Sequence, residues 1–325
     1  MQIKRRAAYA AIYLLWGGSY LAIRQVVHVV PPFLAASARY SISGTILLVF
    51  SFAIRREAPP SMRRILNCMA TGIAMTALGY SIVFWAATRL PSWTVAVLTA
   101  TSFLWTYIGE CLVLRSERPR LRMFFFLLMG LAGIPLVGGT ALQRGHSISS
   151  FAAVSVVAGA LSWSASSLAI KRIRLPESCW QTAGFQLATA GILLAGVSRA
   201  LGEWTRVPEM NITLGYQPLL GMTYLIFGGS VIAFGSFHWL MRRESPSLVA
   251  TFAYANPIVA MALGIGFAGE SCSVRQLIGA IAILLSVVLI WKTQPARVSV
   301  SMAKDRTDAS SGGEARLNGF SETVA

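Results

Sequence analysis

Aspartate is almost missing from this chain. The sequence of 325 residues holds two aspartates, Asp305 and Asp308, and both stand close to the C-terminus. The long apolar part that precedes them therefore has no aspartate for a catalytic triad, a carboxylate pair or a divalent-cation site. A hydrolase embedded in that part is poorly supported.

Cysteine and histidine are also scarce, and none of them stands in a metal-binding pattern. Neither a CxxC nor an HExxH spacing occurs among Cys68, Cys111, Cys179, Cys272, His28, His146 and His238. Cysteines that are spread singly along a chain favour neither disulfides nor a zinc site. We therefore expect no metal ion and no other cofactor.

Charged residues make up only 12% of the chain, whereas hydrophobic residues make up 55% and the mean hydropathy is +0.62. A chain of this composition belongs in a bilayer. Stretches of about 20 apolar residues cross the hydrocarbon core, and they must be helical because irregular backbone cannot face lipid. Such stretches are found at 7–27, 33–54, 66–87, 93–114, 122–141, 151–171, 180–200, 217–240, 247–268 and 274–292.

The net charge of +16 does not indicate a nucleic-acid partner, because the basic residues form clusters in alternate loops instead of one patch. The positive-inside rule places such clusters in the cytoplasm. Both termini are then cytoplasmic, with a multi-pass chain between them. The clusters lie at 4–6, 55–64, 115–122, 171–174 and 242–243.

One segment of the chain occurs twice. The sequence WGGSYLAIR, which begins at Trp16, recurs as WSASSLAIK from Trp163. This duplication predicts two copies of five spans each, 7–141 and 151–292. Because five is odd, the second copy enters the membrane from the opposite side, so we expect an all-α membrane protein with ten transmembrane helices in two inverted repeats. The polar residues 295–325 are expected to form a disordered cytoplasmic tail.

The repeated tryptophans lead the candidate site. Trp16 lies about 14 Å into its helix, near the middle of the bilayer, and Ser19 shares its face. Trp163 and Ser166 repeat this pair. Tryptophan usually lies at the membrane interface, so two tryptophans at mid-depth indicate the walls of a substrate cavity. Close helix packing through the small neighbouring residues is the alternative.

Arg39 stands about six residues into the second span, where an unpaired guanidinium requires an acceptor, a wet cavity or a path to the interface. Two interpretations follow. It either attracts the carboxylate of a substrate, or it bonds loop carbonyls near Pro31 and Pro32 as a structural residue. Its counterpart in the second copy, Gln186, is uncharged, so its role is not duplicated.

The ninth span carries Tyr254, Asn256 and Pro257 at mid-depth. Proline removes one backbone donor and frees a carbonyl, so we expect the helix to break there. The freed carbonyl, the amide and the hydroxyl contact either a solute or one another. Tyr80 in the third span either faces the same space or belongs to an aromatic packing stripe.

Glu110 is the one acid within a predicted span. Carriers driven by protons usually offer an intramembrane carboxylate, which makes Glu110 the candidate for proton coupling. Its place near the cytoplasmic end of the fourth span also fits a solvated or arginine-paired carboxylate.

Three groups of residues resemble the EamA family of the drug/metabolite transporter superfamily. They are Trp16-Gly17-Gly18-Ser19-Tyr20, then Pro32 with Ala38-Arg39-Tyr40, and the run from Ser245-Pro246-Ser247 through Ala253-Tyr254-Ala255-Asn256-Pro257 to Gly269-Glu270. The resemblance covers about residues 7 to 292, and the second half is similar to YedA-like bacterial inner-membrane permeases. It implies two EamA repeats of five helices in the bacterial inner membrane and the export of amino acids, other metabolites or drugs.

One departure from the family concerns the first copy. Phe103 stands where the family often has proline, and Arg115-Ser116-Glu117-Arg118 stands for its Leu-Gly-Glu. The two copies are therefore not expected to gate symmetrically.

These observations predict a secondary transporter, not an enzyme, that exports a small polar or amphipathic metabolite by alternating access. Its partners are the small-molecule substrate and the lipid bilayer, and a homodimer is left open. An uncoupled facilitator is one alternative, and a non-transporting membrane sensor or scaffold is another. The cavity between the copies is expected to be lined by Trp16, Ser19, Trp163, Ser166, Tyr254 and Asn256, with Arg39 orienting an anionic group.

Overall fold

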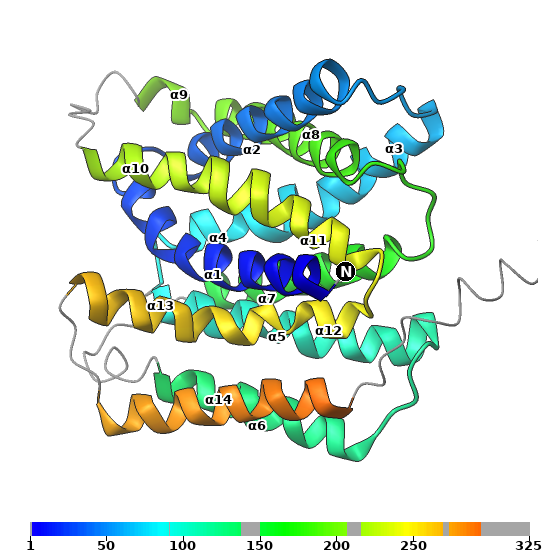
Figure 1. Ribbon diagram of the computed structural model, residues 1–325. Coiled ribbons are helices and arrows are strands. Elements are labelled where there is room, and N and C mark those ends of the chain that lie inside the picture. Colours follow the sequence, from blue (N-terminus) through cyan, green and yellow to red (C-terminus); the bar gives the residue numbers. More distant parts are fainter. Residues whose placement is uncertain (1, 91, 138–149, 207–215, 269–272, 294–325) are drawn as a thin grey trace, which may run out of the picture. The chain divides into compact units, whose positions relative to one another are not determined.

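The computed structural model describes residues 2–90, 92–137, 150–206, 216–268 and 273–293, and in these ranges all regular structure is helical (Figure 1). The expected tail at 295–325 lies outside the described residues. The helices fall into segments that repeat in the same order in the two halves of the chain.

The first half contains five helical segments. The second of them ends in a π-helical turn, the third contains a π-helical stretch at its centre, and the fourth ends in one. In chain order the elements are α1 (Gln2–Val27), α2 (Pro32–Val49) with η1 (Phe50–Ile54), α3 (Met62–Gly72) with η2 (Ile73–Tyr80) and α4 (Ser81–Ala86), α5 (Ser92–Gly109) with η3 (Glu110–Leu114), and α6 (Leu121–Val137).

The second half repeats this order, and its third segment again has a central π-helical stretch. A short helix, α9 (Glu203–Arg206), follows the second segment. The five segments are α7 (Ser150–Ala169), α8 (Cys179–Ala200), α10 (Tyr216–Tyr224) with η5 (Leu225–Ile232) and α11 (Ala233–Met241), α12 (Pro246–Ala250) with α13 (Phe252–Ala268), and α14 (Val274–Thr293).

Five helical segments of the described chain are long and apolar enough to cross a membrane. They are Pro32–Ile54, Met62–Ala86, Ser150–Ala169, Tyr216–Met241 and Pro246–Leu263. Three shorter apolar helices lie at Leu98–Leu114, Leu121–Gly133 and Leu277–Thr293. With α1 and α8 the described residues form ten segments, which is consistent with ten spans.

Contacts between the two halves come in reciprocal pairs. The two second segments, α2 and α8, pack on each other, and so do the two fifth segments, α6 and α14, at the opposite side of the bundle (Figure 1). The first segment of each half packs on the fourth segment of the other, α1 on α13 and α7 on α5. Reciprocal contacts of this kind are what a pseudo-two-fold axis between two inverted repeats produces.

Glycines at equivalent positions allow α2 and α8 to approach closely. A Cβ atom added to Gly44 would lie 2.5 Å from the backbone nitrogen of Ala188, and one added to Gly191 would lie 2.5 Å from the backbone nitrogen of Ser41. Small residues are typical of such helix contacts in membranes, where van der Waals packing replaces the hydrophobic effect. The repeated glycines therefore join the two halves at one point.

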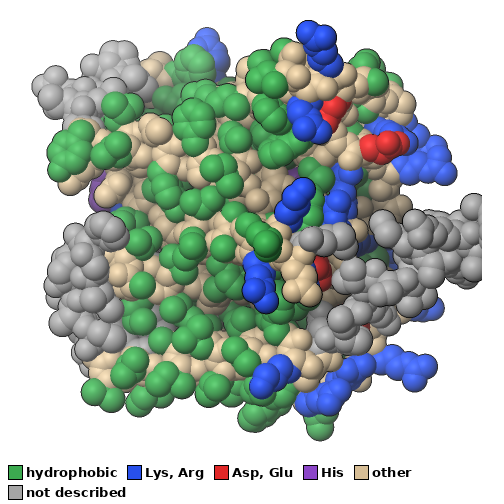
Figure 2. Space-filling view, viewed as in Figure 1, with side chains coloured by type: hydrophobic (Ala, Val, Ile, Leu, Met, Phe, Trp, Pro, Cys, Tyr) green, Lys and Arg blue, Asp and Glu red, His purple; other side chains and the backbone are tan. Residues whose placement is uncertain are grey.

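The surface separates charged from apolar side chains. Lysine and arginine gather at one end of the bundle, the end where α1 begins, and hydrophobic side chains cover the middle (Figures 1 and 2). Large apolar residues on this surface are widely exposed, among them Leu14, Phe125, Ile192, Leu219 and Leu284. Such a surface is stable against lipid tails and not against water.

The predicted helix break at Pro257 is wrong in its position. Helix α13 continues through Pro257, and the interruption falls at Thr251, between α12 and α13. There the Thr251 hydroxyl donates to the carbonyl oxygen of Leu248 at 2.6 Å, and the Tyr254 amide binds the Thr251 oxygen three residues earlier. A side chain that competes for a backbone acceptor interrupts a helix in this way. Pro257 still removes the donor that would bind the carbonyl of Ala253.

We predict that Gly191→Ala lowers the melting temperature of the purified protein by several degrees. The added methyl meets the backbone of Ser41, and overpacking of this kind costs about 1–3 kcal/mol, more than the helix propensity of alanine returns. Gly196→Ala on the same helix is the matched control, because its added Cβ has nothing within 4 Å. Thermal unfolding in detergent measures both, and a Gly191→Ala protein as stable as wild type would contradict the contact.

Candidate functional site

A cavity lies between the two copies, bounded by the first four segments of each. It is lined in the first copy by Trp16, Tyr20, Arg39, Tyr40, Thr76, Gly79, Tyr80, Thr99 and Ser102, and in the second copy by Gly159, Ala160, Trp163, Leu187, Gly229, Ser230, Phe234, Phe252, Ala253 and Asn256. The fifth segments, α6 and α14, contribute no residue to this lining. The cavity is thus a feature of the interface between the repeats.

The third segment of each copy enters the lining through its π-helical stretch. The stretch Ile73–Tyr80 supplies Thr76, Gly79 and Tyr80, and the equivalent stretch Leu225–Ile232 supplies Gly229 and Ser230. A π-helix widens the helical turn, and such turns are frequent at functional sites. The two stretches thus line the cavity from opposite repeats with glycines, two small hydroxyl side chains and Tyr80.

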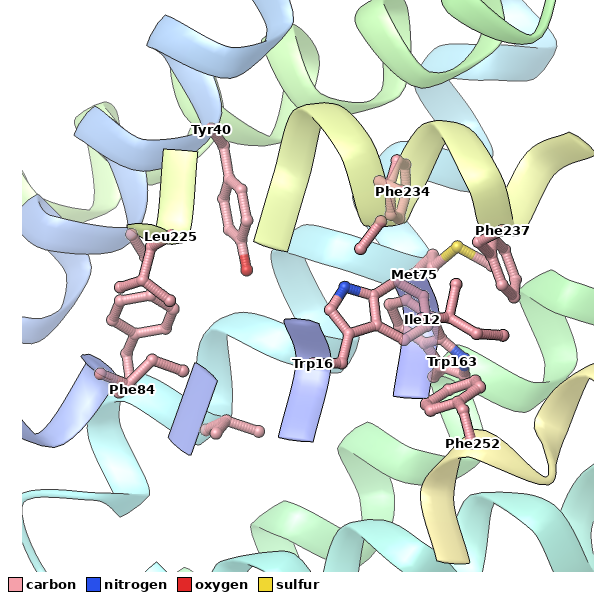
Figure 3. Close-up of a cluster of buried hydrophobic side chains, with 14 of the residues drawn as sticks. Ile12, Trp16, Tyr40, Met75, Phe84, Trp163, Leu225, Phe234, Phe237 and Phe252 are labelled. Atoms are coloured by element: carbon pink, nitrogen blue, oxygen red, sulfur yellow. The ribbon is translucent and has the colours of Figure 1, made fainter. Parts of the chain in front are cut away.

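Aromatic rings from four elements pack together at one side of the cavity, and three of them, Trp16, Trp163 and Phe252, belong to its lining. Trp16 on α1 and Trp163 on α7 meet edge to face, with ring centroids 5.6 Å apart and an interplanar angle of 86°. Phe252 lies 4.5 Å from Trp16, and Phe237 lies 5.5 Å from Trp163. Figure 3 shows these four rings together, with Tyr40 and Phe84 set apart to one side. Edge-to-face pairs are favourable geometries for aromatic rings, so these rings form a packed cluster.

The indole of Trp16 also makes a polar contact. Its Nε1 donates to the carbonyl oxygen of Gly229 at 2.8 Å, which joins α1 to η5. A buried indole N–H normally finds an acceptor, and here it finds one on the π-helical stretch of the other copy.

Arg39 provides a buried positive charge in the cavity wall. Its side chain is almost completely buried, with 2% of the residue exposed, and Nε donates to Ser230 Oγ at 2.8 Å. The guanidinium carbon lies 5.2 Å from the ring centre of Tyr40 and 5.8 Å from those of Tyr80 and Phe84. Nη1 has no hydrogen-bond partner among the described residues. Cation–π contacts stabilise the charge without neutralising it.

Other polar atoms of the lining also lack partners within the described chain. They are the hydroxyls of Tyr40, Thr76 and Tyr80 and the amide oxygen of Asn256. Buried polar groups are nearly always hydrogen-bonded in proteins, because leaving one unpaired costs about 1–3 kcal/mol. Several such atoms around one cavity indicate that something else binds them there.

Five of the residues proposed from the sequence lie together in the lining: Trp16, Arg39, Tyr80, Trp163 and Asn256. Three others, Ser19, Ser166 and Tyr254, are not part of the lining. Ser19 donates to the carbonyl of Leu15 and Ser166 to that of Ser162, each along its own helix. Serine in a helix interior often makes this bond, so the repeated serines are occupied by the backbone.

Tyr254 belongs to a different part of the structure. It is completely buried, its hydroxyl donates to the carbonyl of Leu127 at 2.8 Å, and its ring meets Phe103 at 4.8 Å. The helix turns by about 100° for each residue, so Tyr254 points almost opposite to Asn256, which lines the cavity. Tyr254 therefore anchors α13 to α6.

Glu110 also lies outside the lining, towards the end of the bundle where α1 begins. It is 1% exposed, and Oε2 accepts from the backbone N–H of Ser247 at 3.0 Å and from the Ser247 hydroxyl. Oε1 accepts from the hydroxyl of Ser116 at 3.2 Å. The carboxylate thus holds the start of α12 against the end of α5 and η3.

An ion pair closes the same end of the bundle. Arg5 on α1 binds Glu244, which precedes α12, with 2.6 Å between Nε and Oε1. Lys171, just after α7, donates to the backbone oxygen of Glu244 at 2.7 Å. Burial raises the pKa of Glu244, and the charge of Arg5 lowers it in part. Burial lowers the pKa of Lys171. The first segments of both copies are therefore connected here to the fourth segment of the second copy.

Sequence reasoning missed several lining residues. Tyr20 follows Trp16 by one helical turn and could have been found from that spacing. The π-helical stretches cannot be recognised in the sequence in this way, because the change of backbone hydrogen bonds from i+4 to i+5 spacing depends on the neighbours that pack against the helix. Thr76 and Ser230 were therefore not predicted, although Ser230 is the hydrogen-bond partner of Arg39.

No group of three or more histidine, cysteine, aspartate or glutamate side chains in the described part of the chain could hold a metal ion. The described cavity lining contains no acidic residue either. Its chemistry is that of an aromatic pocket with one guanidinium and several neutral hydrogen-bonding groups, which suits the binding of a small molecule.

Known proteins resemble the chain over nearly its whole described length. The inner membrane transporter YedA of Escherichia coli (strain K12) is 32% identical over 285 residues, covering 87% of this chain and 89% of that protein. A "Probable amino-acid metabolite efflux pump" of Salmonella typhimurium is 24% identical, covering 86% of this chain and 91% of that protein. Protein PecM of Dickeya dadantii is also 24% identical, covering 89% and 92%.

A solved crystal structure shares the fold. It superposes with a TM-score of 0.70 at 24% identity and covers 88% of this chain and 97% of its own. The model of the EamA-like transporter family matches the chain twice, at residues 7–139 and 150–292, one match for each repeat. The two matches and the reciprocal packing of the repeats agree, and the chain belongs to the EamA-like transporter family.

Proposed function

We propose that this transporter exports amino acids or other small metabolites across the bacterial inner membrane by alternating access, with both termini in the cytoplasm. The named relatives are an inner membrane transporter and a metabolite efflux pump, which supports this membrane and this direction. The gathering of basic residues at the end where α1 begins supports a cytoplasmic amino terminus (Figure 2).

The observation that carries the proposal is the place of the cavity between equivalent segments of the two copies. Trp16 and Trp163, the same residue of the repeated motif, meet in its wall. In inverted-repeat carriers the substrate binds at the repeat interface, and the two copies exchange conformations to open either side. A cavity lined by four segments of each copy has the symmetry that this exchange requires.

The contacts at the amino-terminal end support a state closed towards the cytoplasm. Arg5, Lys171 and Glu244 connect α1, the end of α7 and the start of α12, and Glu110 holds Ser247 beside them. Passage to an inward-open state separates these elements. Thr251, where α12 and α13 meet, is the point at which the cytoplasmic part of the fourth segment turns relative to the rest.

We predict that Trp16→Ala and Asn256→Ala each reduce solute flux at least severalfold in proteoliposomes, because both side chains line the cavity. The screen uses pools of amino acids, nucleosides and cationic dyes. Trp204→Ala and Asn67→Ala are matched controls, since Trp204 lies exposed on α9 and Asn67 binds the Arg174 carbonyl away from the cavity. Both controls should keep their flux. Unchanged flux in the two cavity variants, when correctly folded, would refute this site.

Removal of residues 295–325 separates a transporter from a sensor that signals through its tail. A transporter keeps its flux without this segment. If no pool is transported in vesicles where a control carrier works, a sensor or scaffold becomes the better interpretation.

For Glu110 we propose proton coupling: protonation removes the charge that strengthens its two hydrogen bonds from Ser247 and so weakens this contact. We predict that an imposed pH gradient increases flux in wild type and that Glu110→Gln removes this increase while exchange of the same solute without a gradient continues. Glu177→Gln is the control, because that side chain is 90% exposed. A Glu110→Gln protein that still responds fully to the gradient would exclude Glu110 as the coupling group.

A further inference from the structure

The charge of Arg39 has no counter-charge in the described structure. Its one side-chain hydrogen bond goes to a neutral hydroxyl, Ser230 Oγ, and no ion pair of the described residues includes it. Nη1 is buried and has no hydrogen-bond partner among the residues that the structure describes. Burying a cation without an anion costs free energy, and an intramembrane arginine of this kind is by default a candidate for binding an anion.

The groups around the guanidinium suit an anion. The rings of Tyr40 and Tyr80 lie against it, and within the described chain the hydroxyls of both tyrosines and of Thr76 have no hydrogen-bond partner. Each hydroxyl can donate one hydrogen bond, and the guanidinium donates through a planar fork that matches a carboxylate. These donors belong to the lining of one cavity.

The described lining offers no matching site for a cation. The described lining contains no aspartate or glutamate, so an ammonium group would meet only neutral acceptors such as the Asn256 amide oxygen. A ligand with one negative charge neutralises the cavity, whereas a zwitterion leaves the guanidinium charge uncompensated and a cation adds to it. The two negative charges of a phosphate dianion would exceed the one positive charge of the guanidinium.

We propose that Arg39 binds the carboxylate of a singly charged organic acid whose apolar body lies against Trp16, Trp163 and Phe252. This assignment rests on the proposed transport function and narrows its substrate class. The preferred substrates are monocarboxylates, including amino acids whose amino group is blocked and therefore uncharged. They bind ahead of zwitterionic amino acids, neutral amides and amines.

The test compares ligands of equal shape on the purified full-length protein by isothermal titration calorimetry. The probes are 3-phenylpropanoate, 3-phenylpropanamide, 3-phenylpropylamine and phenylalanine. Only the acid brings a negative charge to the buried guanidinium, and opposite charges attract strongly where water is excluded, so we expect the acid to bind about tenfold or more tightly than the amide. Equal binding of acid and amide, or no binding of the acid at millimolar concentration, overturns the proposal.

Variants locate the effect at Arg39. Arg39→Gln should reduce the affinity for the acid about tenfold or more and reduce the affinity for the amide much less, because only the acid loses an attraction between opposite charges. Arg24→Gln is the matched control, because Arg24 is exposed on α1 and outside the cavity lining. Acid binding that survives Arg39→Gln overturns the assignment. The wild-type comparison of acid and amide decides the matter even if Arg39→Gln does not fold.

Two further experiments are needed. One asks whether inorganic anions bind the site as well as a carboxylate does, and the other separates ligand binding from transport. Titration with sodium chloride and with inorganic phosphate tests simple anions, and either one binding as tightly as the acid overturns the carboxylate assignment. Binding of the acid without flux in proteoliposomes would leave the site standing and refute transport. Flux of amines or dyes without any preference for acids would support transport and refute the site.

Discussion

The odd number of helices in each copy is the constraint on which the rest of the structure depends. A unit that crosses the bilayer five times ends on the side opposite to its start, so its tandem duplicate is inverted. Equivalent helices then run antiparallel, and the main contacts between the copies have reciprocal ones, as for α1 with α13 and α7 with α5. The cavity follows from the same constraint, because the segments that meet at the axis are those that line it.

Function enters where the copies differ. The second segments offer Arg39 in one copy and Gln186 in the other, and each binds a hydroxyl on the third segment of the opposite copy. Gln186 Nε2 donates to Thr71 Oγ1 at 2.8 Å, and Arg39 Nε donates to Ser230 Oγ at 2.8 Å. The geometry is conserved between the repeats and the charge is not. Only Arg39 belongs to the cavity lining, so one copy supplies its charge.

The sequence alone predicted what local pattern and composition determine. The helical class, the duplication and the cavity position of Trp16 and Trp163 follow from apolar length and a repeated motif, and Arg39 stands out because charge is rare in a span. The failures are of another kind. Tyr254 was proposed because it stands beside Asn256 and Pro257 at mid-depth of its span, although two residues turn a helix side chain almost to the opposite face. The interruption at Thr251 depends on a side-chain bond to Leu248, which a prediction based on proline overlooks.

In the proposed alternating-access cycle, the end of the bundle at which α1 begins must also be able to open. The ion pair of Arg5 and Glu244 is partly buried, because the side chain of Arg5 is 33% exposed and that of Glu244 is 8% exposed. It therefore stabilises this end of the bundle more than a fully exposed pair would. Edge-to-face rings such as Trp16 and Trp163 gain about 0.5–1.5 kcal/mol beyond their buried area. Several interactions of this size are strong enough together to define one state. In the proposed cycle each single contact is weak enough to break, and the equivalent contact of the other repeat forms in its place when the cavity opens to the opposite side.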